Sequence, residues 1–269
     1  MAAVAMQIMG ILNVTPDSFS DGGRYAEFES AVTQAGELIA AGADILDVGG
    51  ESTRPFADPV DTEEELRRVI PVIKAIRQKY ALPISIDTTK AVVAREALQA
   101  GANIINDISA LAKDPEMIEV VRASSVPVII MHMQGTPSDM QIEPFYEDVV
   151  AEIIDFFQER IAWITGKGVD RHRLILDPGI GFGKTLQHNL SLIKHLSAFS
   201  CFNLPLLLGH SRKRFLGTIT GIQAEKERDL ATAVIAALCA DQNIAMVRVH
   251  NVAATRQALL LAEAVRSAE

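Results

Sequence analysis

Cysteine, positive charge and long apolar runs are all scarce in this sequence. Its 269 residues include two cysteines, Cys201 and Cys239, in unrelated contexts without metal-ligand spacing, so we expect both to be packing residues in a reducing compartment, the cytoplasm. The formal net charge is −9, which argues against a nucleic-acid partner because neutralising phosphates needs a broad basic face. No run approaches the roughly 18–20 apolar residues of a membrane span, so we expect no membrane partner.

Common nucleotide-binding and nucleophile motifs are missing as well. The stretch DPGIGFGKT (177–185) resembles a P-loop, but that motif needs a glycine at the position of Pro178. We expect its glycines to let the loop pass close to a ligand instead. No G-x-G-x-x-G follows the first apolar stretch, and no Ser–His–Asp or Cys–His arrangement is recognisable. These absences argue against an ATPase, a dinucleotide-binding domain and a nucleophilic hydrolase.

The sequence does contain a repeated unit. LIAAGADILDVGG (38–50) and ALQAGANIINDIS (97–109) both run from a helical pattern through Ala-Gly-Ala into a short apolar stretch. Gly42 and Gly101 suit the left-handed residue that ends a helix, and a strand starts within two residues, as a short αβ loop requires. The repeat is therefore the joint of a β/α unit.

This unit predicts a (β/α)8 TIM barrel in a single domain, residues 1–269. Helical patterns such as 63–80, where we expect Pro71 to kink or break the helix, and 146–164 separate the strands. Polar residues are spread over almost every strand end, as on a barrel rim, whereas a doubly wound sheet gathers its site at one switch point. The expected strands lie near residues 6–14, 43–49, 83–87, 104–108, 127–133, 173–177, 205–210 and 245–250.

The carboxyl ends of these strands carry the candidate site. They read Asn13, Asp47, Asp87, Asn106, His132, Asp177, His210 with Ser211, and Arg248 with His250. The period of two along a strand places Asp87, Asn106, Asp177 and Arg248 at the barrel mouth, pointing inward. For Asp87 and Asp177 the alternative is a helix N-cap. We expect Asp47 to be structural and His132 to be a satisfied core histidine.

Sorting these side chains by charge divides the predicted mouth in two. One half has acceptors, Asp87 and Asp177, with the Asn106 amide, and suits a flat heterocycle rich in N–H groups. The other half has donors and positive charge and suits phosphate or diphosphate. Its members are Arg54, for which a surface salt bridge is the alternative, Lys213, Arg248 and His250.

Eight stretches, in order along the whole chain, resemble the bacterial dihydropteroate synthases. They are MGILNVTPDSFSDGG (9–23), GGESTRP (49–55), SIDTTK (85–90), GANIINDIS (101–109), MHMQGTP (131–137), LDPGIGFGK (176–184), GHSRKRF (209–215) and VRVHNV (247–252). The first two are quite specific to that family. The resemblance implies a barrel enzyme of folate synthesis that joins 6-hydroxymethyl-7,8-dihydropterin diphosphate to p-aminobenzoate, giving 7,8-dihydropteroate and diphosphate.

The same resemblance implies roles for matching residues. Those holding the pterin would be Asp87, Asn106, Met131, Asp177 and Lys213. Those around the diphosphate would be Asn13, Arg54, Arg248 and His250, with Asn13 also a ligand of Mg²⁺. Those bordering p-aminobenzoate would be Thr53, Pro55, Phe182, Ser211 and Phe19.

The resemblance also implies a lid, a chemistry and an assembly. TPDSFSDGG (15–23), which contains Asp17 and Phe19, would be a lid over the site, and Asp17, Asp87 and Lys213 would act in closure and charge stabilisation. We expect a dissociative displacement and a homodimer. One departure is Phe56, at a position where the family most often has glycine; we expect its ring to pack outward on the rim.

Two other functions fit the acceptor half of the site. A pterin-binding methyltransferase passes a methyl group to a corrinoid and has no use for a cationic half. A non-catalytic pterin-binding barrel is expected to have lost rim charges or lid residues, and none is missing. Arg54, Arg248 and His250 therefore favour the synthase, and Mg²⁺-dependent retention of diphosphate distinguishes it from both.

Overall fold

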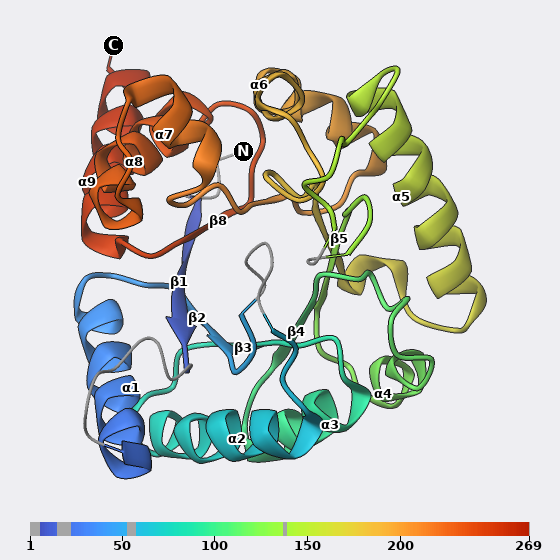
Figure 1. The fold of residues 1–269 in the computed structure, drawn as a ribbon, viewed down its shortest axis with the longest axis vertical. Coiled ribbons are helices and arrows are strands. Elements are labelled where there is room, and N and C mark those ends of the chain that lie inside the picture. Colours follow the sequence, from blue (N-terminus) through green and yellow to red (C-terminus); the bar gives the residue numbers. More distant parts are fainter. Residues whose placement is uncertain (1–5, 15–22, 53–57, 137–138, 269) are drawn as a thin grey trace.

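Eight parallel strands form one sheet at the centre of the protein in a computed structural model (Figure 1). The structure describes residues 6–14, 23–52, 58–136 and 139–268. The strands are β1 (Gln7–Asn13), β2 (Ile45–Gly49), β3 (Ile84–Asp87), β4 (Ile104–Asp107), β5 (Val128–Met131), β6 (Leu174–Asp177), β7 (Leu207–Leu208) and β8 (Met246–Val249). Each lies within one of the predicted stretches.

Helices follow every strand and surround the sheet (Figure 1). They are α1 (Gly23–Ala40), α2 (Thr62–Lys79), α3 (Ala91–Ala100), α4 (Met117–Ala123), α5 (Val149–Gly166), α6 (Leu186–Lys194), α7 (Arg214–Thr220), α8 (Asp229–Leu238) and α9 (Val252–Arg266). Short 3₁₀ helices are η2 (Arg171–Arg173), η3 (Leu196–Phe202) and η4 (Glu225–Arg228). The alternation of strand and helix is the one that the sequence predicts.

The strand order confirms a barrel and excludes the doubly wound alternative. The order is β6-β5-β4-β3-β2-β1-β8-β7, with every pair parallel. The two end strands meet, because Leu176 and Leu206 form a parallel bridge and the Leu176 N–H donates to the Pro205 carbonyl oxygen at 2.9 Å. A closed ring places all eight carboxyl strand ends on one rim.

Glycines end the helices at the repeated joints, as predicted. Gly101 follows α3 with φ +113°, and its N–H donates to the carbonyl oxygens of Ala97 and Leu98. Gly42 has φ +97°. Other residues adopt this left-handed backbone only at a cost of about 1–2 kcal/mol. The chain therefore turns sharply at these glycines and enters the next strand.

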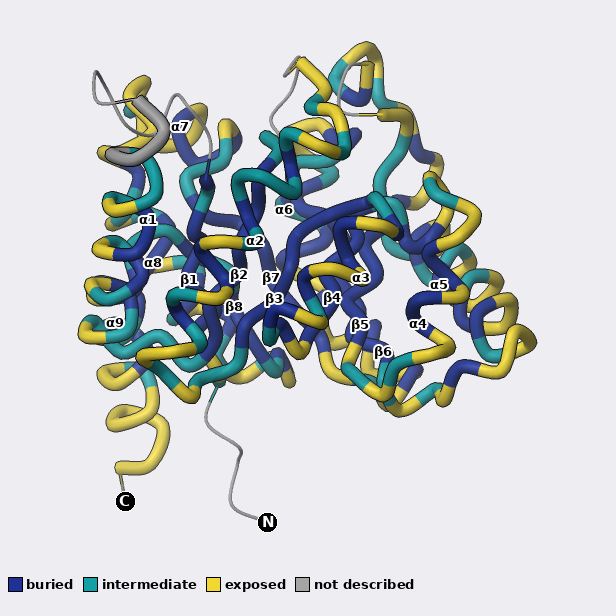
Figure 2. Tube along the Cα trace, turned by 90° about the horizontal axis from the view of Figure 1, so that it is seen from below, coloured by how far each residue is buried: buried dark blue, intermediate teal, exposed yellow. Residues whose placement is uncertain are grey.

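Two apolar layers hold the barrel together. Inward-facing side chains from seven strands fill its interior: Met9, Ile45, Ile104, Ile129, Ile175, Leu207 and Met246. A larger layer packs the outer faces of the strands against the helices. Figure 2 shows the strands as a buried centre, with the exposed residues mainly on the outer helix faces and connecting loops. Full burial of each such side chain stabilises the fold by about 1.5–3 kcal/mol.

The helix that contains Pro71 does not break, contrary to one of the two expected outcomes. α2 is a single helix of 18 residues, and Pro71 lies on its exposed side. Val69, Val72 and Ile73 face the core next to it. Packing of this apolar face compensates for the backbone hydrogen bond that proline removes.

Candidate active site

Polar side chains from several strands converge just above the apolar barrel interior. Asp47, Asn106, Asp177 and Arg248 each lie two residues beyond a member of the interior layer, and therefore on the same face of their strands. Met131 follows Ile129 in the same way. The register pairs Asp87 of β3 with Asn106 of β4. The contacts described below confirm that Asp87, Asn106 and Arg248 share the inner face, as predicted.

Arg248 lies between two carboxylates. Its Nε is 2.5 Å from Asp47 Oδ2 and its Nη2 is 2.6 Å from Asp87 Oδ2. One guanidinium thus serves two buried carboxylates. Burial raises the pKa of Asp87 to about 7, Arg248 opposes this rise, and Asp47 adds to it. The predicted cation of the diphosphate half is thus bonded to a carboxylate of the pterin half.

Asp47 has a larger part in the site than the structural role that the sequence predicts for this strand end. The side chain is fully buried, and besides Arg248 it contacts Asn106, whose Nδ2 donates to Oδ2 at 3.3 Å and to Oδ1 at 3.4 Å. Asp47 is structural, as expected, but what it orients is the site itself. The sequence signal for this is that Asp47 lies two residues after Ile45, so both side chains are on the inner face of β2. Because Nδ2 faces Asp47, Asn106 directs its carbonyl oxygen elsewhere, as an acceptor.

Asp177 and Lys213 form the second charged group of the rim. Asp177 Oδ1 accepts the Gly179 N–H at 2.8 Å, and the Lys213 Nζ lies 4.3 Å from the centroid of the Phe182 ring and donates to the Ile180 carbonyl oxygen. Burial raises the pKa of Asp177, and Lys213 opposes that rise. Burial lowers the pKa of Lys213 to about 7, opposed by the charge of Asp177.

The N-cap alternative for the two predicted carboxylates is wrong. Thr185 caps α6, and α3 begins after Lys90. Asp87 and Asp177 are thus free of any capping role, and both are buried at the mouth of the barrel. Arg248 donates to Asp87 and the Gly179 N–H donates to Asp177, and further donors for these buried carboxylates can come from a bound molecule.

Ser211, His250 and Asn13 lie on neighbouring strand ends. Ser211 Oγ is 2.9 Å from His250 Nδ1 and accepts the His250 N–H at 3.1 Å. The tertiary structure thus makes a Ser–His pair that was not recognisable in the sequence, and it joins the β7 and β8 loops. Asn13 ends β1 opposite Gly49; a Cβ on Gly49 would be 3.5 Å from Asp87 Cβ and 3.8 Å from Asn13 Oδ1.

His132 is a satisfied core histidine, as predicted. It is 8% exposed, and its ring packs edge-on against Phe156 with the centroids 4.9 Å apart. Burial, followed by the charge of Lys184, lowers its pKa to about 3. The imidazole is therefore neutral, and its Nδ1 is 3.0 Å from Lys184 Nζ.

The glycines after β6 make close contacts with protein rather than open space. Cβ atoms at Gly179, Gly181 and Gly183 would be 1.9 Å from the His132 carbonyl oxygen, 2.7 Å from Lys213 Cδ and 2.5 Å from the Gln134 carbonyl oxygen. These glycines therefore let the loop pass close to neighbouring protein segments, whereas the sequence predicts a close approach to a ligand. The segment that carries Phe182 thus packs closely against the residues that follow β5.

Gly179→Ala is expected to cost more stability than Gly221→Ala. Both glycines have positive φ, +69° and +77°, but a Cβ at Gly221 meets no atom of the described chain within 4 Å. Gly221→Ala should lower the free energy of unfolding by about 1–2 kcal/mol from backbone strain alone. Gly179→Ala adds overpacking against a backbone oxygen, about 1–3 kcal/mol more. Urea unfolding measures both, and equal losses would contradict the contact.

Several predicted site residues lie outside the described residues. These are Asp17, Phe19, Thr53, Arg54 and Pro55, together with the atypical Phe56. Asp17 and Phe19 belong to the predicted lid, Thr53, Arg54 and Pro55 to the GGESTRP stretch, and Phe56 directly follows that stretch. The described part of the site therefore comprises the barrel mouth and the β5 to β8 loops.

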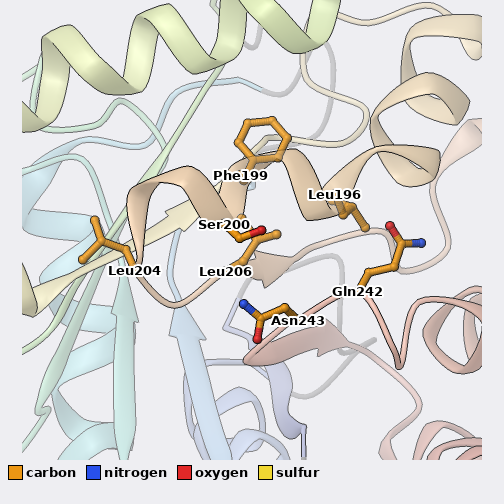
Figure 3. A pocket seen from close by; sticks show the side chains of 7 residues that line it. All are labelled: Leu196, Phe199, Ser200, Leu204, Leu206, Gln242 and Asn243. Atoms are coloured by element: carbon orange, nitrogen blue, oxygen red, sulfur yellow. The ribbon is translucent and has the colours of Figure 1, made fainter.

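A small hollow on the other side of the barrel has no comparable chemistry (Figure 3). Its residues come from η3 and from segments that precede β7 and β8, so it lies at the amino ends of the strands. The residues that line it are Leu196, Phe199, Ser200, Leu204, Leu206, Gln242 and Asn243. It is mainly apolar and has no room for a small molecule. The rim at the carboxyl ends is thus the candidate site.

Known proteins share this fold and sequence over nearly the whole chain. The family described as pterin binding enzyme matches residues 9–250. The dihydropteroate synthase of Escherichia coli (strain K12) is 49% identical over 264 residues, 97% of this chain and 92% of that protein. The dihydropteroate synthase of Xanthomonas albilineans with 4-aminobenzoic acid has a TM-score of 0.93 and 46% identity, covering 98% and 94% of the two chains. The same enzyme in complex with 7,8-dihydropteroate has a TM-score of 0.90 and 42% identity, covering 100% and 97%.

These similarities place the barrel and its rim in a known class. The chain belongs to the pterin-binding enzyme family. Within that family it is a dihydropteroate synthase, a transferase of folate biosynthesis. The described residues contain no helix that is both long and apolar enough to cross a membrane.

Proposed function

We propose that this chain joins 6-hydroxymethyl-7,8-dihydropterin diphosphate to p-aminobenzoate by a dissociative displacement. The observation that supports it is the cluster of Asp47, Asp87 and Arg248, in which acceptor and cationic groups meet at the barrel mouth. A substrate that has both an N–H-rich ring and a diphosphate needs acceptor groups and cationic groups close enough together to contact its two ends at once. Asp87, Asn106 and Asp177 accept the pterin N–H groups, and Met131 lines the slot.

Binding of this substrate exchanges hydrogen bonds at the cluster. Asp87 takes N–H donors from the pterin, and Arg248 turns one side of its guanidinium to the diphosphate with His250 and Arg54. Each charged hydrogen bond contributes about 1.5–3 kcal/mol. A ligand with only the ring or only the diphosphate satisfies half of the cluster, so the site selects for molecules that carry both.

Bond cleavage then follows from the layout of charge. The bond between the pterin methylene carbon and the diphosphate oxygen breaks, and the electron pair leaves with the oxygen. Arg248 and His250 neutralise the charge that develops on the leaving group, while Asp87 and Asp177 stabilise the cationic pterin. The p-aminobenzoate nitrogen then attacks the methylene and releases a proton to solvent. Phe182 and Ser211 would border this substrate, the role that the resemblance also implies for Thr53, Pro55 and Phe19. A steep dependence of the rate on the basicity of substituted anilines would contradict a dissociative step.

Mg²⁺ fits the residues at the end of β1. Among the described residues no group of three or more His, Cys, Asp or Glu side chains could hold a metal ion by itself. Asn13 supplies one amide oxygen beside Gly49, which suits a hard cation bound mostly through substrate phosphates and water. Asn13 would hold the ion, which supplies additional neutralisation of the diphosphate when bound.

Product stoichiometry tests the proposed reaction. We expect equal amounts of diphosphate and 7,8-dihydropteroate with Mg²⁺ and p-aminobenzoate, and a loss of most activity when EDTA removes the metal. Asn13→Ala should raise the Mg²⁺ concentration needed for half-maximal rate. Binding of the pterin diphosphate without turnover would instead indicate a binding barrel, and methyl transfer to a corrinoid a methyltransferase.

We also propose a homodimer in the cytoplasm. Large apolar side chains that are 47–78% exposed gather on α7, α8 and α9, and α8 and α9 pack together. They are Ile219, Leu230, Val234, Leu238, Leu260, Leu261 and Val265. A second copy is the occupant that we propose for this face, and the mass by sedimentation equilibrium tests it. Both cysteines are free, which supports a reducing compartment. Cys239 is buried, as expected of a packing residue, but the same expectation is wrong for Cys201, which is exposed.

A further inference from the structure

Lys184 is a buried amine with no assigned role in the proposed reaction. Lys184 is only 3% exposed. Its Nζ is 2.9 Å from the Phe182 carbonyl oxygen and 3.0 Å from His132 Nδ1, and both of these partners are neutral. Burial, and then the charge of Lys213, lowers the pKa of Lys184 well below its usual value. Burying an amine costs free energy of desolvation, so a buried lysine without a charged hydrogen-bond partner suggests a specific role.

The two bonds of Lys184 fasten the loop after β6 to the end of β5. His132 directly follows β5, and its N–H donates to the Asp177 carbonyl oxygen at 3.0 Å. The Tyr146 hydroxyl donates to the Gly183 carbonyl oxygen at 3.0 Å, next to the Lys184 contact. The amine therefore bridges the residue that follows β5 and the loop that follows β6.

Phe182 is the residue whose position depends on this bridge. Lys184 holds its carbonyl oxygen, and the Phe182 N–H donates to the Gly179 carbonyl oxygen at 3.0 Å. With the backbone held on both sides, the ring lies 4.3 Å from Lys213 Nζ. A loop without these bonds would have several orientations of the ring, and binding would then have to order it.

We propose that Lys184 is a positioning residue that sets the affinity for p-aminobenzoate by fixing Phe182. This inference rests on the proposed function, in which Phe182 borders p-aminobenzoate. Lys184 is buried and its hydrogen bonds go to Phe182 and His132, so it acts through the loop rather than directly on a substrate. The effect should fall mainly on p-aminobenzoate. Asp87 and Asn106 lie on β3 and β4, and Asp177 Oδ1 is held by the Gly179 N–H, whereas the hydrogen bonds of Lys184 go to His132 and Phe182.

The test compares Michaelis constants for the two substrates in Lys184→Met. Methionine keeps the volume and removes the donors. We expect the KM for p-aminobenzoate to rise about tenfold, the loss of roughly one hydrogen bond, and the KM for the pterin diphosphate to change less than about twofold. A Michaelis constant does not depend on the fraction of enzyme that is folded. Lys184→Gln, which keeps an N–H donor, should recover part of the affinity and serves if the methionine variant does not fold.

A matched control separates positioning from stability. Arg173 is another cation that donates to carbonyl oxygens, Val126 and Val121, each at 2.9 Å, but it lies at the amino ends of the strands. Arg173→Met should lower the melting temperature and leave both Michaelis constants unchanged. Equal rises of both constants in Lys184→Met, or a rise in Arg173→Met of the same size, would overturn the inference.

Phe182→Leu separates this inference from the proposed function. If Phe182→Leu raises the KM for p-aminobenzoate and Lys184→Met does not, the role of Lys184 is wrong and the role of Phe182 stands. If Phe182→Leu leaves it unchanged, both roles are wrong. If both raise it and the double variant is no worse than Phe182→Leu, Lys184 acts through Phe182.

Discussion

Asp47→Asn is expected to lower kcat/KM for the pterin diphosphate by about 10- to 100-fold. The substitution removes the negative charge that accepts from Arg248 Nε at 2.5 Å and from the Asn106 amide. An asparagine oxygen cannot serve both donors as well, and a hydrogen bond to a charged group contributes about 1.5–3 kcal/mol. Because Asp47 orients a residue from each half of the site, the loss affects recognition of the ring and of the diphosphate.

Asp107→Asn is the matched control for this substitution. Asp107 is fully buried and follows Asn106 directly, but its carboxylate faces the other side of β4 and accepts from Ser109 and from the Leu111 N–H. Its loss should lower stability and leave kcat/KM within about threefold of the parent. Steady-state kinetics at saturating p-aminobenzoate measures both variants. Similar values for Asp47→Asn and the parent would show that the Asp47 contacts do not orient the site.

The summed contribution of Asp87 and Lys213 to the free energy of unfolding is expected to be smallest near pH 7. The native pKa of Asp87 is raised from 3.8 to about 7, so between these pH values the native state holds a proton that the unfolded chain releases. Its stabilising contribution is therefore full below pH 4 and is lost as the pH rises through 7. The groups that act on it are Arg248, Asp47, Glu65 and Asp107.

Lys213 has the opposite effect at higher pH. Burial lowers its native pKa from 10.5 to about 7, with Asp177 opposing and Arg248 adding to the shift. Between these values the unfolded chain holds the extra proton, so the contribution of Lys213 is full above pH 10.5 and is lost as the pH falls through 7. Each shift corresponds to a few kcal/mol, since one pKa unit is about 1.4 kcal/mol.

Urea unfolding across pH 4–10 with two variants tests this minimum. The difference in unfolding free energy between the parent and Asp87→Asn should shrink as the pH rises from 4 to 7. The difference between the parent and Lys213→Met should grow in the parent's favour from 7 to 10. Flat differences over these windows would show that the two groups titrate in the native state as they do in the unfolded chain.

The sequence by itself determined the fold and the face on which the site lies. Apolar stretches separated by helical periods specify eight buried strands, and the glycines at 42 and 101 specify where helices end, because both signals are local. The period of two then assigns Asp87, Asn106 and Arg248 to the inner face. This inference needs only the alternation of side chains along a strand.

The tertiary structure alone decided which of these side chains meet. Arg248 contacts Asp47 across 201 positions and Asp87 across 161, and periodicity specifies a face but not a partner. The pairing of β8 with β1 brings Arg248 close to Asp47 of β2, and only then does Asp47 join both halves of the site. The same holds for Lys184, which a sequence pattern cannot distinguish from a surface lysine. Its burial results from the packing of the β6 loop onto β5, a contact between segments that local propensity does not encode.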